Sequence, residues 1–139
     1  MDTTILNQVA AEFGAPLYVY DSARIQTQFE RLTEAFKSVP RLKLNYAAKA
    51  LSNISILRLM KHLGSGLDTV SIQEVRLGLL AGFAPEDIIY TPNGVSLGEL
   101  EEAAALGVQI NIDNLSVLEQ FGSSHPHVPV CIRINPHVM

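Results

Sequence analysis

The stretch GLDTVSIQEVRLGLLAG, residues 66–82, contains one complete unit of a pattern that the rest of the chain repeats. Its first five residues form an apolar run typical of a buried strand, and Ile72–Ala81 has the spacing of an amphipathic helix. Ser71 can cap that helix and Gly82 can end it, because a hydroxyl satisfies free amides and glycine adopts the left-handed conformation that closes helices. The stretch therefore predicts a strand followed directly by a helix.

The same pattern recurs on both sides of this stretch. Strand-like runs begin at Leu42, Gly66, Asp87, Val108 and Pro129, in steps of 24, 21, 21 and 21 residues. Helical patterns lie between them, at Ile54–Leu63, Ile72–Ala81, Leu97–Leu106 and Leu115–Phe121. The expected caps are Asn53, Ser71, Ser96 and Asn114, and the expected helix ends are Gly64, Gly82, Gly107 and Gly122. This alternation predicts an α/β fold with parallel strands joined by right-handed crossovers.

Two architectures are compatible with this pattern, an open doubly wound sheet and a closed (β/α)8 barrel. The near-uniform step favours the barrel, but a barrel needs about eight units and about 250 residues. This chain of 139 residues has five strands of the series. We therefore expect residues 1–139 to be a single partial domain, the truncated first half of a barrel over 39–139. Residues 1–38 are expected to add a helix, a short strand at Leu17–Tyr20 and a second helix over 22–38.

The composition limits the classes of function. Hydrophobic residues make up 47% of the chain and charged residues 17%, which fits a folded core. The net charge of −4 without a basic stripe argues against nucleic-acid binding. No apolar run reaches the ~20 residues of a membrane helix, and the N-terminus lacks the layout of a signal peptide. The single cysteine, Cys131, cannot form an internal disulfide and is expected to be buried in its strand, so we expect a cytoplasmic protein.

Polar residues collect at the carboxyl ends of the expected strands, where both architectures place their chemistry. In chain order they are Lys49, Asp68, Ser71, Glu74, Asn93, Asp113, Asn114, Arg133 and Asn135. Ser71, Asp113 and Asn114 are expected to cap helices rather than to bind ligands. The chain has no HExxH, CxxC, GxSxG or GxxxxGK motif, so the sequence predicts no metal site and no phosphate loop of that kind.

Lys49 stands apart because it has alanine on each side in LKLNYAAKALSN, residues 42–53. In apolar surroundings a lysine loses solvation of its charged form, so the pKa of its amine falls and the neutral amine becomes a nucleophile. The alternative is a lysine whose amine extends from a loop into solvent. The spacing alone does not decide between the two.

Six segments carry a resemblance to a known family. They are APLYVYD (15–21), LNYAAKALSN (44–53), GLDTVSIQEVRLGLLAG (66–82), TPNGVSLGELEEAAALG (91–107), INIDNLSVLEQF (110–121) and VCIRINPHV (130–138). In order and spacing they resemble the N-terminal part of the diaminopimelate decarboxylases. These are pyridoxal-phosphate enzymes with a TIM barrel of the alanine-racemase type. The Y-x-x-K-A element is the most specific of the motifs.

The resemblance implies an activity, a cofactor and a set of site residues. The activity is conversion of meso-diaminopimelate to L-lysine and CO2 in lysine biosynthesis. Lys49 matches the lysine that holds pyridoxal phosphate covalently. Asp68, Glu74 and Arg133 match residues expected to bind or orient the cofactor, and for each an ion pair inside the barrel is the alternative. The family also implies a homodimer.

The chain departs from the family at two places, and several residues expected from the family have no counterpart in it. Ile72-Gln73 replaces two glycines that are common in the family, and Val95 replaces a frequent lysine. The residues expected to hold the phosphate and the pyridine nitrogen would lie beyond Met139, so we expect the 139-residue chain to lack turnover on its own. The alternatives are a decarboxylase of ornithine, arginine or carboxynorspermidine, and a non-catalytic decarboxylase-like binding or regulatory module.

Overall fold

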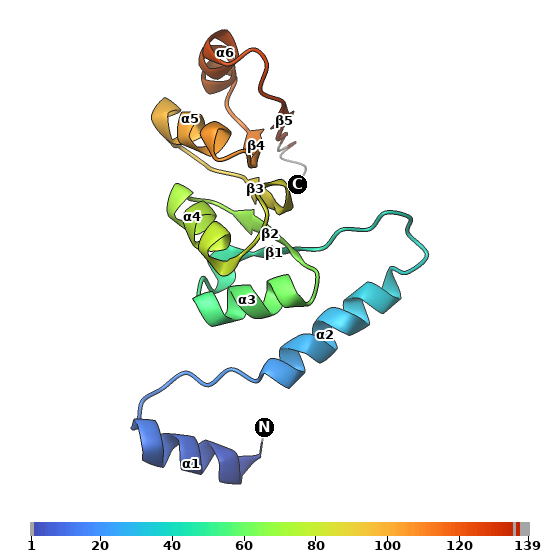
Figure 1. Ribbon diagram of the computed structural model, residues 1–139, viewed down its shortest axis with the longest axis vertical. Coiled ribbons are helices and arrows are strands. Elements are labelled where there is room, and N and C mark those ends of the chain that lie inside the picture. The colour runs from blue at the N-terminus through green and yellow to red at the C-terminus, as the bar shows by residue number, and fades with distance from the viewer. Residues whose placement is uncertain (1, 135, 137–139) are drawn as a thin grey trace. The chain divides into compact units, whose positions relative to one another are not determined.

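The computed structural model describes residues 2–134 and residue 136 (Figure 1). It divides into two compact units, Met1–Leu42 and Lys43–Met139. That both belong to a single domain stays a prediction. The second unit contains the sheet and all of the expected site residues.

The first unit consists of two helices, α1 (Thr3–Phe13) and α2 (Ser22–Ala35). Asp2 and Asp21 cap them by accepting hydrogen bonds from amides of the first turn. The helix predicted over 22–38 is confirmed as far as Ala35. The strand predicted at Leu17–Tyr20 is not formed, because these residues pair with no strand in the described part of the chain. An apolar run becomes a strand only when a neighbour bonds its backbone groups.

The second unit is built on a five-stranded parallel sheet with the strand order β1-β2-β3-β4-β5. The strands are β1 (Asn45–Ala47), β2 (Gly66–Thr69), β3 (Ile88–Tyr90), β4 (Gln109–Ile112) and β5 (Val130–Ile132). A doubly wound sheet reverses its strand order at a switch point, whereas a barrel adds each strand beside the preceding one. The observed order confirms the α/β prediction and decides for the first five strands of a (β/α)8 barrel.

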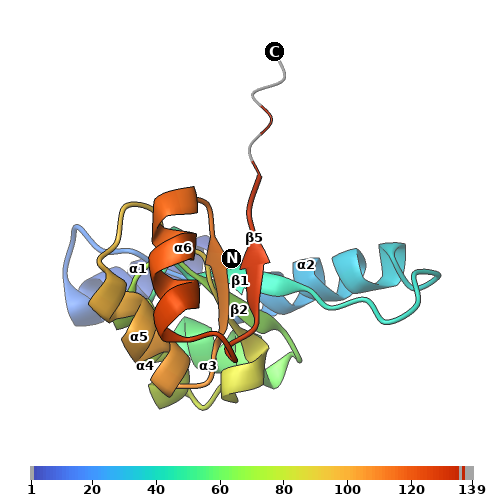
Figure 2. The same cartoon turned by 90° about the horizontal axis from the view of Figure 1, so that it is seen from above.

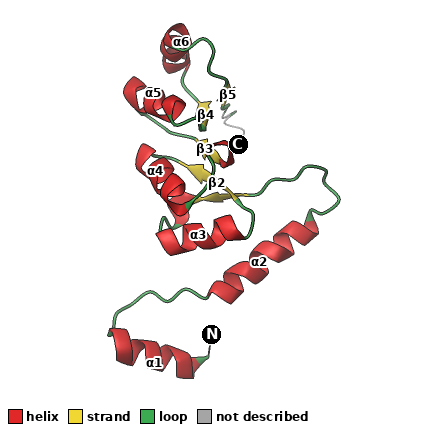
Figure 3. Cartoon of the chain, in the orientation of Figure 1, coloured by secondary structure: helices red, strands yellow, loops and turns green. Residues whose placement is uncertain are grey.

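Helices alternate with these strands along the chain, and Figure 3 distinguishes the two by colour. The helices are α3 (Ile54–His62), α4 (Ile72–Ala81), α5 (Leu97–Ala105) and α6 (Leu115–Ser124), and two 3-10 turns add η1 (Ala48–Ala50) and η2 (Pro85–Asp87). In both views α4, α5 and α6 lie on the same side of the sheet (Figures 1 and 2).

The predicted helix starts are confirmed. Asn53, Ser71, Ser96 and Asn114 are the N-caps of α3, α4, α5 and α6. Gly64, Gly82 and Gly107 follow helices with positive φ angles, as expected. The helix end predicted at Gly122 is wrong, because α6 continues through it to Ser124. Glycine inside a helix costs about 1 kcal/mol relative to alanine, which tertiary packing offsets.

The core lies between the sheet and its helices. The strand side chains that point to the helices are buried: Leu67, Thr69, Ile88, Tyr90, Ile110 and Ile112. They pack with Val75 of α4, Leu100 of α5 and Phe121 of α6, which are also buried. Gly78 lets α4 approach closely, since a Cβ atom there would lie 2.5 Å from Leu67 Cδ2.

The alternate strand residues point to the opposite face, which we call the open face. Asp68, Ile89 and Asn111 lie on it and are only half-buried. Cys131 belongs to the same set and is exposed, so the prediction that it is buried is wrong. The residues next to Cys131 in the strand are also apolar, so the sequence pattern does not indicate which of them face the helices.

Candidate active site

The carboxyl ends of the strands meet at one edge of the sheet, because all five strands are parallel. Ala47 of β1 is paired with Asp68 of β2, and Asp68 is paired with Ile89 of β3. Lys49 follows two residues after Ala47 in the chain. The register therefore brings the end of the Lys49 strand next to the Asp68 strand.

Lys49 lies in η1, the 3-10 turn that follows β1. The Leu51 amide donates to the Ala48 carbonyl at 3.0 Å, and the Tyr46 hydroxyl donates to the Leu51 carbonyl at 3.0 Å. Ala48 is fully buried, but the Lys49 side chain is exposed. The described residues of this chain therefore do not enclose Lys49 in apolar surroundings. They hold it on a well-anchored turn with its amine accessible.

Asp68 is connected by side-chain hydrogen bonds to the next two strands. Its Oδ1 atom accepts from the Thr91 hydroxyl at 2.9 Å, and the Thr91 oxygen accepts from Asn111 Nδ2 at 3.0 Å. Thr91 and Asn111 were not among the site residues predicted from the sequence. The signal for Asn111 is a polar residue between the buried Ile110 and Ile112, since strict alternation marks the face that the helices do not cover.

Glu74 lies at the beginning of α4, where its side chain completes a capping arrangement. Its Oε2 atom accepts from the Val70 amide at 2.8 Å, and the Glu74 amide donates to Ser71 Oγ at 3.2 Å. One carboxylate oxygen is therefore engaged with the backbone of the loop between β2 and α4. The structure brings Glu74 to that loop rather than onto the open face.

Arg133 directly follows β5 and is exposed. Its amide donates to the Ile112 carbonyl at 2.9 Å, which extends the pairing of β4 and β5 by one residue. The residue lines a pocket of about 250 Å³ between the ends of these strands, together with Asp113. Asn135, the last polar residue of the expected series, lies outside the described residues.

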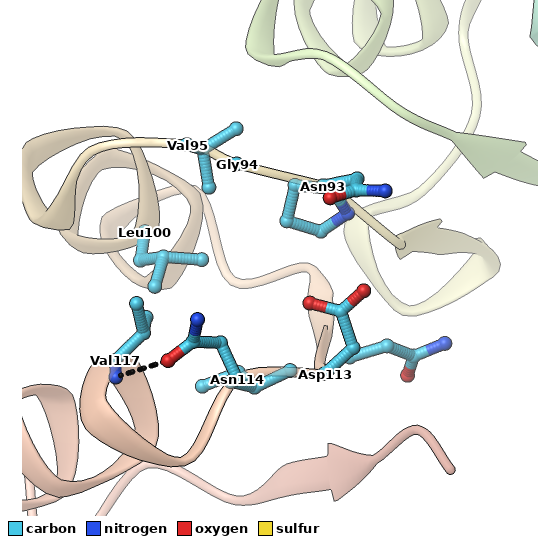
Figure 4. A pocket seen from close by; sticks show the side chains of 10 residues that line it. Asn93, Gly94, Val95, Leu100, Asp113, Asn114 and Val117 are labelled. Carbon is cyan, nitrogen blue, oxygen red and sulfur yellow. Dashed lines mark hydrogen bonds between the residues drawn. The ribbon is translucent and has the colours of Figure 1, made fainter. Parts of the chain in front are cut away.

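A second pocket, of about 240 Å³, lies between the loop after β3 and the loop after β4 (Figure 4). It is lined by Pro92, Asn93, Gly94, Val95, Leu100, Asn111, Ile112, Asp113, Asn114 and Val117. Asn114 caps α6, its side chain accepting from the Val117 amide at 3.2 Å. Asp113, which was expected to cap a helix, does not do so and instead turns its carboxylate toward the Asn93 loop (Figure 4). Val95, one of the departures from the family, forms part of the apolar wall.

Two further features bear on the kind of site. Among residues 2–134 and 136, no group of three or more His, Cys, Asp or Glu side chains is arranged to hold a metal ion. None of the helices in the part of the chain that the structure describes has the length and apolar character needed to cross a membrane.

Comparison with known proteins identifies relatives over almost the whole chain. Diaminopimelate decarboxylase of Methanothermobacter thermautotrophicus is 40% identical over 133 residues, which are 94% of this chain and 31% of that protein. The enzyme of Streptomyces coelicolor is 38% identical over 140 residues, 98% of this chain and 30% of the relative. The chain thus spans about a third of the length of the curated relatives it matches.

Solved structures give the same result. The crystal structure of diaminopimelate decarboxylase from Helicobacter pylori complexed with L-lysine matches with a TM-score of 0.83 at 37% identity, over 96% of this chain and 35% of that one. Lysine/ornithine decarboxylase from Vibrio vulnificus complexed with putrescine matches with a TM-score of 0.84 at 27% identity, over 94% and 36%.

The sequence profile described as "Pyridoxal-dependent decarboxylase, pyridoxal binding domain" matches residues 22–139. That range includes Lys49, Asp68, Glu74 and Arg133 and every strand of the sheet. The chain therefore belongs to the pyridoxal-dependent decarboxylases, within the part of their sequence that forms the pyridoxal-binding domain.

Proposed function

We propose that the protein is a pyridoxal-phosphate-dependent decarboxylase that converts meso-diaminopimelate to L-lysine and CO2. The observation that carries the proposal is Lys49, which has an accessible amine at the carboxyl edge of the sheet, next to the strand of Asp68. Relatives named diaminopimelate decarboxylase, at 30–40% identity, support this substrate over others.

The side chains at this edge have the chemistry that pyridoxal phosphate requires. Lys49 has an amine for its aldehyde, Asp68 a carboxylate for a cationic nitrogen, and Arg133 a guanidinium for an anionic group. When bound, the cofactor supplies an aromatic ring that takes up the electron pair left as CO2 departs. These residues therefore fit the cofactor that the family name implies.

The protein's own groups would have separate tasks. Lys49 binds the cofactor and, once its amine is free, holds a proton at Nζ or releases it. Asp68 stabilises positive charge at the edge, with Oδ1 already fixed by Thr91. Glu74 acts through the start of α4, where it orders the loop that follows β2. Arg133 offers a guanidinium in the pocket at the ends of β4 and β5, which suits a substrate carboxylate, and the Asp113 carboxylate, turned toward the Asn93 loop, suits an ammonium group.

Cofactor trapping tests the assignment of Lys49. The protein, expressed from its complete reading frame, is mixed with pyridoxal phosphate, reduced with borohydride and mapped by mass spectrometry. We expect label on Lys49, lost in Lys49→Ala and kept in Lys43→Ala. Lys43 is a matched control, because it lies just before β1 and its amine is paired with Asp87 at 2.6 Å. Label spread over many lysines, or unchanged in Lys49→Ala, would contradict the proposal.

Release of CO2 from candidate amino acids tests the substrate. We expect the highest kcat/KM with meso-diaminopimelate, and lower values with ornithine, arginine and carboxynorspermidine. A preference for ornithine would assign the protein to the activity named for the Vibrio vulnificus structure. Binding of pyridoxal phosphate without any CO2 release would instead favour the non-catalytic module.

We further propose that the protein acts as a homodimer, as the resemblance implies, and that it works in the cytoplasm, as expected from its sequence. Large apolar side chains exposed on both units support an association, among them Tyr18 at 90% and Leu115 at 75% exposure. Sedimentation equilibrium is expected to give twice the chain mass, and a monomer mass at micromolar concentration would contradict it.

Fractionation of cells that express the tagged protein is expected to recover it with cytoplasmic markers, and recovery in the membrane fraction would oppose this.

A further inference from the structure

The open face of the sheet carries a connected row of side-chain hydrogen bonds that crosses three strands. Gln109 Nε2 donates to Asn111 Oδ1 at 3.4 Å, and Asn111 Nδ2 donates to Thr91 Oγ1 at 3.0 Å. The Thr91 hydroxyl then donates to Asp68 Oδ1 at 2.9 Å. The row begins with an exposed amide on β4 and ends on a half-buried carboxylate on β2.

All donors in this row point toward Asp68. The Asn111 carbonyl accepts from Gln109, which turns the Asn111 NH2 group to Thr91. The Thr91 oxygen accepts that bond, so its own hydrogen is free to donate to the carboxylate. Aligned hydrogen bonds polarise one another, and bonds to an ionised group are the stronger kind. The row therefore favours one orientation of the Asp68 side chain.

That orientation leaves one oxygen of Asp68 available at the site. Oδ1 is engaged with Thr91, whereas Oδ2 accepts no hydrogen bond from residues 2–134 or 136. The strand of Asp68 pairs with the strand that leads to Lys49. An acceptor held at this edge is suited to a protonated nitrogen.

We propose that Thr91 and Asn111 are positioning residues, which orient Asp68 so that Oδ2 meets a protonated nitrogen of the bound cofactor or substrate. The inference rests on the proposed function. A purely structural role, joining neighbouring strands, is the competing explanation. Thr69 shows what that role looks like: its hydroxyl donates to the Ile89 carbonyl at 2.9 Å, and the residue is fully buried on the helix-covered face.

The test compares threonine variants on the two faces in the protein from its complete reading frame. Thr91→Val removes the donor to Asp68 without a change in shape, Thr91→Ser restores it, and Thr69→Val is the structural control. The readouts are the affinity for pyridoxal phosphate and the rate at which borohydride fixes it to Lys49. Since a hydrogen bond to an ionised group contributes about tenfold or more in binding, we expect Thr91→Val to weaken affinity by at least that factor.

The control variants should behave differently from Thr91→Val. Thr91→Ser should stay within about twofold of the parent, since the bond to a charged acceptor is kept. Thr69→Val should lower the melting temperature and leave the affinity unchanged. If Thr91→Val fails to fold, Asn111→Leu takes its place, because it removes the donor to Thr91 and adds no charge. We expect Asn111→Leu also to lower the affinity for pyridoxal phosphate.

The possible failures are distinguishable. Parent affinity in Thr91→Val or Asn111→Leu, with label still on Lys49, overturns the positioning role and leaves the proposed function intact. Equal loss of affinity in Thr69→Val and Thr91→Val shows a structural role and also overturns it. A parent protein that takes no label on Lys49 overturns the proposed function, and the inference falls with it.

Discussion

On the helix-covered face of the sheet, Leu67 and Tyr90 are fully buried. One residue further along the chain, Asp68 of β2 and Thr91, which directly follows β3, are half-buried and hydrogen-bonded to each other. The two faces use alternate residues of one backbone, so a step of one position moves a side chain from the packed core to the open face. Substitutions on the covered face should therefore change stability first, and those on the open face should change cofactor binding first.

The largest effect is expected for Leu67→Ala on the covered face. A fully buried leucine replaced by alanine loses transfer free energy and leaves a cavity, at a cost of about 2–5 kcal/mol in the free energy of unfolding. Ile89→Ala is the matched variant on the open face, where the side chain is only half-buried, and should cost less. Urea denaturation measures both. Equal costs would break the distinction between the faces.

Tyr90→Phe is expected to act in the opposite direction. The Tyr90 hydroxyl is buried and has no hydrogen-bond partner among the described residues. Relieving an unsatisfied buried hydroxyl should stabilise the protein by about 1 kcal/mol, measured as a higher urea midpoint. A loss of stability would show that the hydroxyl has a partner.

The same variant should change the response to alkaline pH. Burial, and then the charges of Glu99 and Glu102, raise the pKa of Tyr90 from 10.0 to about 12. The folded state thus favours the neutral phenol, and the unfolded state releases the proton at lower pH. The contribution of Tyr90 to the free energy of unfolding is fully present below pH 10 and is lost as the pH rises toward 12. In Tyr90→Phe the free energy of unfolding should decrease less over this pH range. Parallel stability curves for the two proteins would contradict this.

Glu74→Gln has the smallest expected effect, and its comparison with Glu74→Ala separates a structural role of Glu74 from a role in cofactor binding. Glu74→Ala removes the acceptor for the Val70 amide and should cost about 1 kcal/mol, as the loss of a cap does. Glu74→Gln keeps an acceptor, so both stability and affinity for pyridoxal phosphate should stay near those of the parent. Weaker cofactor affinity in Glu74→Gln at unchanged stability would assign the charge of Glu74 directly to the cofactor.

Local chemistry made most of the fold predictable from the sequence. The four N-caps and the helix over Ile72–Ala81 follow from side-chain hydrogen bonding and periodicity within a few residues. The predictions of secondary structure were wrong where residues distant in the sequence decide the conformation. Leu17–Tyr20 needs a partner strand to become a strand, and Gly122 is kept in α6 despite its low helix propensity.

The places of the candidate site residues in the fold were more predictable from the sequence than their contacts. Parallel strands bring their carboxyl ends to one edge, so the positions of Lys49 and Asp68 followed from the strand rhythm. The link from Asp68 through Thr91 to Asn111 depends on the pairing register of three strands, which no local pattern specifies. The exposure of Lys49 likewise depends on which residues surround the turn in space, and not on the alanines beside it.

The strictly sequential order of the strands also has a consequence for how the chain folds during synthesis. From β2 onward, each strand pairs with a neighbour made about 21 residues earlier, as in the pair Leu67 and Ile88. Contacts between residues so close in the chain close short loops, which costs less conformational entropy than pairing strands that lie far apart in the sequence. The sheet can therefore grow in the order in which the ribosome delivers its strands, each finished β/α unit acting as the template for the next.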